Sequence, residues 1–96
     1  MYESIYKSSL FKDKVIIVTG GGSGIGRCTA HELAALGAHV IILGRTIEKL
    51  EKVAEEISSS GQLCDVYSLD IRESIAIKKV VTSIIEKHGA IHGLVN

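Results

Sequence analysis

The sequence lacks several features that would assign a protein quickly to a functional class. Its 11 lysine and arginine residues balance its 11 aspartate and glutamate residues, so it has no basic surplus for nucleic acid or an anionic membrane. No apolar run is long enough to cross a bilayer, and the amino terminus has no secretory signal. The two cysteines and four histidines show no metal-ligand spacing, so we predict no metal site. These absences favour a cytoplasmic protein that binds neither nucleic acid nor membranes.

Large aromatic side chains are also scarce, with one Phe, three Tyr and no Trp, whereas 46% of the residues are hydrophobic. Small aliphatic side chains suit the thin layers of an α/β protein, in which buried strands are runs of Val, Ile and Leu. Such runs predict strands at residues 15–19, 39–43, 63–69 and 91–96. Between them, apolar residues at helical spacing predict helices that end near Gly37, near Ser58 and at Gly89, with Thr46 as the N-cap of the second.

The predicted order β-α-β-α-β-α-β implies a parallel sheet with right-handed crossovers. A fourth strand with no strand after it would lie at one edge of the sheet, and the helices would cover the two faces incompletely. We therefore expect residues 1–96 to be the N-terminal part of a single domain whose remainder is absent.

A glycine-rich loop separates the first predicted strand from the first helix. It runs Thr19-Gly-Gly-Gly-Ser-Gly-Ile-Gly26. At this place in an α/β unit, backbone N–H groups and the helix dipole converge on an anion, and a Cβ would hold a pyrophosphate away from the backbone. The loop therefore predicts a nucleotide-phosphate site rather than a merely flexible turn.

Three kinds of nucleotide-binding loop compete for this segment. A P-loop needs Lys and Ser or Thr where Arg27 and Cys28 stand, so no Mg²⁺ ligand would be present. A methyltransferase loop, GxGxG, fits, but such folds place an acid after the second strand, where Gly44 and Arg45 stand. Among dinucleotide loops, GxGxxG fails from every glycine in the loop, whereas TGxxxGxG fits without exception.

The chain resembles the classical short-chain dehydrogenases/reductases over residues 12–96. Their coenzyme loop is TGxxxGIG, Asp70 matches their acid that binds the adenine ring, and Leu94-Val95-Asn96 matches the start of their LVNNAG strand end. The resemblance implies a Rossmann-type doubly wound parallel sheet, here truncated, in a homo-oligomeric enzyme that acts on a small molecule. The coenzyme-binding residues it implies are Gly20, Ser23, Gly24, Ile25, Gly26, Arg45, Asp70, Ile71 and Asn96.

The residues after the second predicted strand indicate which coenzyme is preferred. An acid there would accept hydrogen bonds from the ribose hydroxyls of NAD and repel a 2′-phosphate, but the chain has Gly44 and then Arg45. The arginine offers a planar fork of donors that matches phosphate geometry, and Ser23 could add a hydroxyl. In the resembled family an arginine at this place marks NADP preference, so we predict NADP(H).

No residue of this sequence is predicted to be catalytic. The resembled family uses a Ser-Tyr-Lys group with Tyr and Lys spaced YxxxK, but Tyr2, Tyr6 and Tyr67 are followed four residues later by Tyr, Leu and Ile. We expect the coenzyme-binding fragment of a reductase or dehydrogenase that transfers hydride to or from a carbonyl, hydroxyl or acyl-thioester substrate. The alternatives are a stand-alone nucleotide-binding module and, less favoured, a methyltransferase-like domain.

Overall fold

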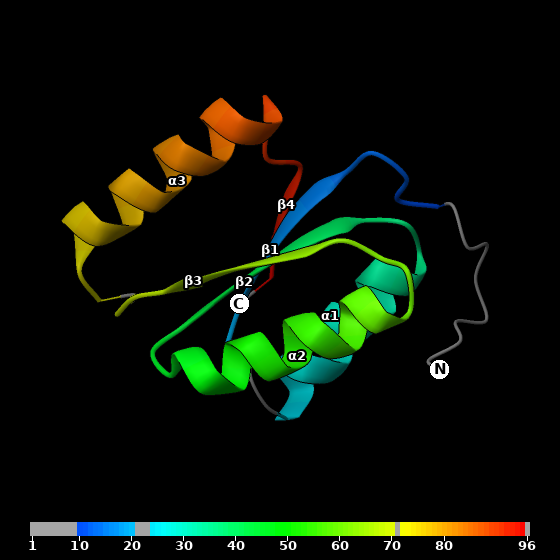
Figure 1. Ribbon diagram of the computed structural model, residues 1–96. Helices are drawn as coiled ribbons and strands as arrows, with labels where there is room; N and C mark the ends of the chain where they lie inside the picture. Colours follow the sequence, from blue (N-terminus) through cyan, green and yellow to red (C-terminus); the bar gives the residue numbers. More distant parts are fainter. Residues whose placement is uncertain (1–9, 21–23, 71, 96) are drawn as a thin grey trace.

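A computed structural model of the chain describes residues 10–20, 24–70 and 72–95, and its strands and helices alternate as predicted (Figure 1). The elements are β1 (Val15–Thr19), α1 (Gly24–Ala35), β2 (His39–Gly44), α2 (Ile47–Ser59), β3 (Cys64–Ser68), α3 (Ser74–His88) and β4 (Gly93–Val95).

The four strands form one parallel sheet in the order β3-β2-β1-β4. The chain builds outward from β1 to β3 and then returns to the other side of β1, so the strand order reverses between β1 and β4. At the centre of the sheet, Ile17 lies opposite Ile41 on one side and Leu94 on the other. The prediction that the fourth strand lies at an edge is confirmed, and ligands of open α/β sheets bind at such a reversal.

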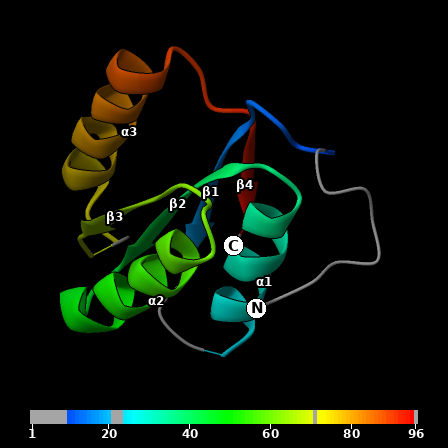
Figure 2. The ribbon, with the colours of Figure 1, turned by 45° about the vertical axis from the view of Figure 1, so that its right-hand side comes forward.

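Helices α1 and α2 cover one face of the sheet, and α3 covers the other, as the turned view makes clear (Figure 2). The central strands are buried on both faces, so alternate side chains enter two separate cores. The first core holds Ile16, Val18, Val40 and Ile42 of the strands together with Ala30, Ala34, Ala38, Leu50, Val53 and Ile57. The second core is smaller and holds Val15, Ile17, Ile41, Leu43 and Ile84.

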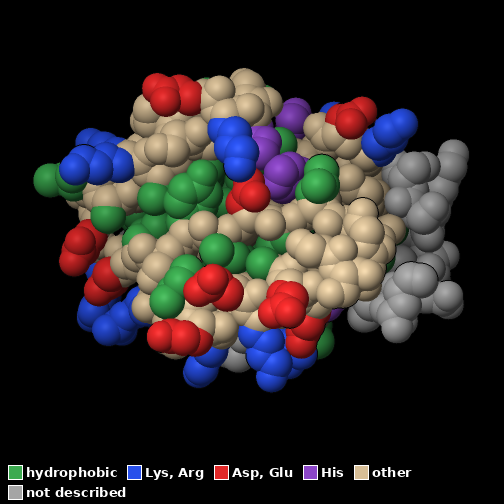
Figure 3. Space-filling model, viewed as in Figure 1, with side chains coloured by type: hydrophobic (Ala, Val, Ile, Leu, Met, Phe, Trp, Pro, Cys, Tyr) green, Lys and Arg blue, Asp and Glu red, His purple; other side chains and the backbone are tan. Residues whose placement is uncertain are grey.

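The face under α3 is the thinly covered one. Ile84 is the one residue of this helix that is buried, whereas Ile75 is 70% exposed, and Leu94 of the edge strand is 65% exposed. Hydrophobic side chains also reach the surface between α3 and α2 in the space-filling view (Figure 3). The predicted incomplete covering of the sheet is therefore seen on the α3 side.

The structure adds three local details. Thr46 precedes α2 in an extended conformation, but its side chain makes no capping hydrogen bond. The third helix begins at Ser74, and Gly89 ends it in the left-handed conformation, as expected. Cys28 of α1 is exposed and lines a recess shared with Glu56 of α2. No helix in the described parts of the chain is long and apolar enough to cross a membrane.

Candidate functional site

The loops that follow β1, β2 and β3 are held together where the carboxyl ends of the strands lie. The Gly20 N–H donates a hydrogen bond to the Leu43 carbonyl at 2.9 Å, and the Leu69 N–H donates to the Gly44 carbonyl at 2.7 Å. These two bonds continue the strand ladders by one residue beyond the strand ends. They place the glycine loop next to the segment after β2, and that segment next to the one after β3.

Two of the predicted loop glycines, Gly20 and Gly24, have backbone conformations that favour glycine. Their φ angles are 69° and 58°, in the left-handed region that other L-residues rarely adopt. A Cβ built on either glycine would meet no atom of the described residues within 4 Å, so those residues leave the space in front of both open. Helix α1 begins at Gly24, and the N–H groups of its first turn have no partners within the helix. Ser23 lies outside the described residues.

A side chain at Gly44 would be crowded by Leu50 of α2, independently of any ligand. A Cβ at this position would lie only 3.1 Å from Cδ2 of Leu50, whose side chain is buried beneath α2. The absence of an acid at the end of β2 therefore has a structural reason, which the sequence pattern did not reveal.

Arg45 follows at the edge of the sheet and is exposed. Its carbonyl accepts a hydrogen bond from the Ser68 hydroxyl at 3.3 Å, which fixes the backbone of Arg45 against the end of β3. Within the described parts of the chain its guanidinium forms no salt bridge. The cation is therefore available to an anion bound at this edge.

Asp70 is engaged by Arg72, a residue that the sequence analysis missed. The Arg72 guanidinium donates to the two Asp70 carboxylate oxygens at 3.0 Å and 2.8 Å, and the Arg72 N–H donates to Oδ1 at 2.9 Å. These hydrogen bonds, with a smaller contribution from the charge of Arg45, hold the pKa of Asp70 well below its usual range. The spacing of two residues was the available signal, since an aspartate often bonds the backbone two residues on.

The remaining predicted residues are placed as follows. Ile25 is 87% exposed at the start of α1, and Gly26 is half-buried behind it. Ile71 and Asn96 lie outside the described residues. The neighbour of Asn96, Val95, accepts a hydrogen bond through its carbonyl from the Thr19 hydroxyl at 3.3 Å, so the end of β4 lies beside the start of the glycine loop.

Arg27, at the place where a P-loop would have lysine, is bound to the next helix. Its guanidinium donates both to Oε1 of Glu56 on α2, at 3.0 Å, and to Oε2. His31 lies 2.9 Å from Oε1 of the same carboxylate, and the hydrogen bonds from His31 and Arg27 lower the pKa of Glu56. Arg27 therefore ties α1 to α2, in agreement with the exclusion of a P-loop.

A parallel sheet whose glycine loop and helix N-terminus meet where the strand order reverses defines a dinucleotide-binding protein of the Rossmann type. The profile of one protein family, described as short chain dehydrogenase, matches residues 14–96. The chain belongs to the short chain dehydrogenase family.

Relatives and solved structures agree with this assignment. The chain is 41% identical over 86 residues to the probable 2,4-dienoyl-CoA reductase 3 of Caenorhabditis elegans, covering 88% of this chain and 28% of that protein. The structure of a citronellol catabolism dehydrogenase (AtuB) from Pseudomonas aeruginosa PAO1 is 58% identical, with a TM-score of 0.96 over 99% of this chain and 40% of that one. A metagenomic short-chain oxidoreductase in complex with NADP is 35% identical, with a TM-score of 0.87 over 90% of this chain and 39% of that one. The chain thus spans well under half the length of each of these proteins.

Proposed function

We propose that these residues form the coenzyme-binding segment of an NADP(H)-dependent oxidoreductase acting on a carbonyl, hydroxyl or acyl-thioester compound. The observation that carries this proposal is the space that the described residues leave open in front of Gly20 and Gly24, at the start of α1, together with the exposed Arg45 after β2. Oxidoreductase activity is supported by family membership and by the names of the relatives. The small-molecule substrate and self-association of the whole protein belong to the same proposal.

The residues present fit a nicotinamide dinucleotide. The left-handed glycines leave room for a pyrophosphate to approach the backbone, and the N–H groups at the start of α1 can donate to its oxygens. Asp70 would bind the adenine amino group, with Ser23, Ile25, Gly26, Ile71 and Asn96 as further contacts. The coenzyme supplies or accepts the hydride, and these residues hold and orient it.

The arrangement of charges favours NADP(H) over NAD(H). Asp70 has its charge balanced by Arg72, so the nearby Arg45 is not drawn into an ion pair with that carboxylate. An acid at position 44, which would bind the ribose of NAD, is disfavoured by the contact with Leu50. A 2′-phosphate would therefore meet an available guanidinium and no carboxylate directly after β2. The solved relative in complex with NADP supports this preference.

A comparison of the two coenzymes tests the proposal. NADPH and NADH are titrated by fluorescence into the natural polypeptide that carries this sequence, and we expect NADPH to bind more tightly. Arg45→Ala should weaken NADPH binding by about 1.5–3 kcal/mol, or roughly 10–150-fold, and leave NADH binding nearly unchanged.

Arg27→Ala is the matched control, since this arginine is bound to Glu56 of α2. It should leave the ratio of the two affinities unchanged. Equal affinity for NADPH and NADH in the unaltered protein would overturn the proposed preference, and failure of both to bind would overturn the proposed function.

A further inference from the structure

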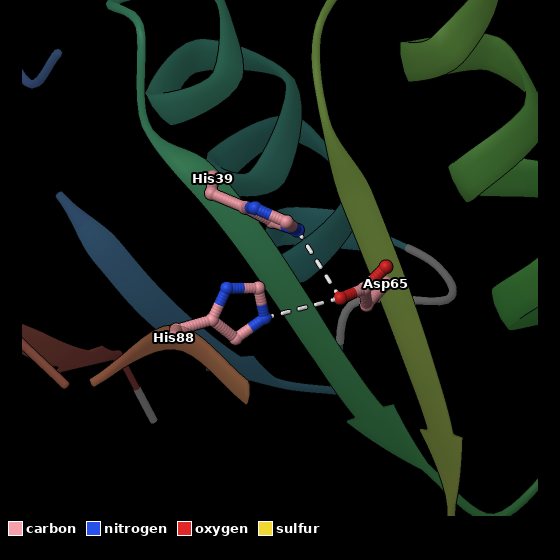
Figure 4. Close-up of side chains that lie close together, drawn as sticks. All are labelled: His39, Asp65 and His88. Carbon is pink, nitrogen blue, oxygen red and sulfur yellow. Dashed lines mark hydrogen bonds and ion pairs between the residues drawn. The ribbon is translucent and has the colours of Figure 1, made fainter. Parts of the chain in front are cut away.

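Two histidines and an aspartate meet near the end of the sheet where the strands begin, opposite to the glycine loop (Figure 4). His39 is the first residue of β2, Asp65 is the second residue of β3, and His88 is the last residue of α3. They are 26 and 23 residues apart in the chain, and only the fold brings them together. Spacing along the chain gave no sign that Asp65 would be a partner of His39.

Both imidazole rings direct a nitrogen at the same carboxylate oxygen (Figure 4). Oδ2 of Asp65 lies 3.2 Å from Nε2 of His39 and 3.3 Å from Nε2 of His88. The two rings are nearly perpendicular, with centroids 4.4 Å apart, and one ligand atom from each of the three residues lies within 4.8 Å of the others. Three potential ligands from three different elements thus lie close together.

The separations match those around a zinc ion. Two ligand atoms bound to zinc at about 2.0–2.1 Å with tetrahedral angles lie roughly 3.3 Å apart. The two nitrogen–oxygen separations therefore already equal tetrahedral edges, and only the third, between the imidazole nitrogens, would have to adjust. Imidazole and carboxylate ligands together suit zinc and its neighbours in the first transition row.

The cluster is sheltered but not sealed. The side chains of His88, His39 and Asp65 are 11%, 19% and 26% exposed, and a recess of about 260 Å³ lined partly by both histidines opens beside them. Histidine side chains reach the surface there, between α3 and the sheet (Figure 3). Water can therefore complete the coordination of an ion held by three protein ligands.

Lys87 is the group that would compete with a bound cation. Its ammonium lies 3.2 Å from the same Asp65 oxygen, but its side chain is 60% exposed and can turn into solvent. An incoming ion would displace Lys87, and the repulsion between the two cations would lower the affinity.

We propose that His39, Asp65 and His88 bind one divalent metal ion of the zinc class, with water in the open position. The ion would join the start of β2, β3 and the end of α3, on the face where α3 is weakly packed. Because the site lies at the opposite end of the strands from the glycine loop, metal binding there does not depend on coenzyme binding.

Metal titration tests this site. The natural polypeptide is freed of metal with a chelator and titrated calorimetrically with ZnCl₂, with CoCl₂ as a spectroscopic probe of tetrahedral coordination. We expect at least tenfold weaker zinc binding in His39→Gln and in His88→Gln than in the unaltered protein, with loss of the cobalt visible bands. His31→Gln is the matched control, because it removes the histidine that contacts Glu56 and leaves the cluster intact. This variant should bind zinc as the unaltered protein does.

Two further variants retain more of the local structure. Asp65→Asn should weaken zinc binding, and Lys87→Met should strengthen it several-fold because the competing cation is removed. Circular dichroism establishes that each variant is folded. The proposal is overturned if the unaltered protein binds no zinc, or if folded Asp65→Asn and Lys87→Met both bind zinc as the unaltered protein does.

Discussion

Cδ2 of Leu50 lies only 3.1 Å from the position that a Cβ would take on Gly44. This single contact links the packing of α2 on the sheet with the character of the coenzyme site. Leu50 is buried in the larger core, and it approaches the last residue of β2 where the chain turns toward Arg45. Crowding by Leu50 thus disfavours an acidic side chain at position 44, the last residue of β2.

We expect Gly44→Ala to destabilise the protein by about 0.5–2 kcal/mol. Crowding against Leu50 costs roughly 1–3 kcal/mol, which outweighs the gain of about 0.4–1 kcal/mol from a stiffer unfolded chain. In a Leu50→Ala background the same change should become stabilising, because the obstructing methyl groups are gone. Urea unfolding of the four proteins in this cycle measures the coupling, and equal effects of Gly44→Ala in both backgrounds would contradict the contact.

Gly24→Val should abolish coenzyme binding in a protein that still folds. The branched side chain would occupy the open space at the start of α1, and the left-handed backbone would add about 1–2 kcal/mol of strain. NADPH affinity, measured by fluorescence titration, should fall at least 100-fold.

Gly61→Val is the matched control for this loop substitution. Gly61 also has a positive φ, 85°, and open space around it, but it lies between α2 and β3. It should cost similar stability and leave NADPH binding intact. A folded Gly24→Val protein that binds NADPH with normal affinity would show that the phosphate does not lie at this loop.

Glu56→Gln should lower the free energy of unfolding by about 0.2–1 kcal/mol near neutral pH, the range of partly exposed ion pairs. Hydrogen bonds from His31 and Arg27 hold the pKa of Glu56 below its unfolded value. The stabilisation is therefore complete above the usual glutamate pKa of about 4.3 and is lost as the pH falls through the lower folded value. Urea unfolding at several pH values should show the two proteins converging in acid.

Glu51→Gln, an exposed glutamate on the same helix, is the control and should leave stability and its pH dependence unchanged. A Glu56→Gln difference that persists at the lowest pH, or an equal effect of Glu51→Gln, would contradict the assigned role of the Arg27–Glu56–His31 group.

The sequence predicted best the parts of the fold that local chemistry determines. The runs Val15–Val18 and Val40–Leu43 are buried on both faces, so a continuous apolar stretch of strand length has few other structures available. The third strand, Cys64–Ser68, is one residue shorter at each end than the predicted 63–69, although Leu63 and Leu69 still share hydrogen bonds with β2. The glycine loop could be predicted because a left-handed backbone favours glycine. Gly20 and Gly24, the two loop glycines with this conformation among the described residues, show it.

What the sequence did not predict depends on contacts between distant segments. The partner of Asp70 depends on how Arg72 turns back after β3, and the constraint on Gly44 arises from the docking of α2. The His39–Asp65–His88 cluster needs the crossover of α3 to return the end of that helix to the starting edge of β2. No periodicity or spacing within one segment carries that information.

The pairing of Asp70 with Arg72 has a consequence for how tightly the adenine end of a coenzyme can be held. The carboxylate already accepts four hydrogen-bond contacts from Arg72, so a coenzyme amino group bound as proposed would exchange with one of these donors. The binding free energy gained at Asp70 would therefore be the difference between its hydrogen bonds to the amino group and those that it already makes to Arg72. If the coenzyme binds as proposed, the displaced Arg72 guanidinium would add a second cation to the charge of Arg45 near Asp70, which would favour a coenzyme with a 2′-phosphate.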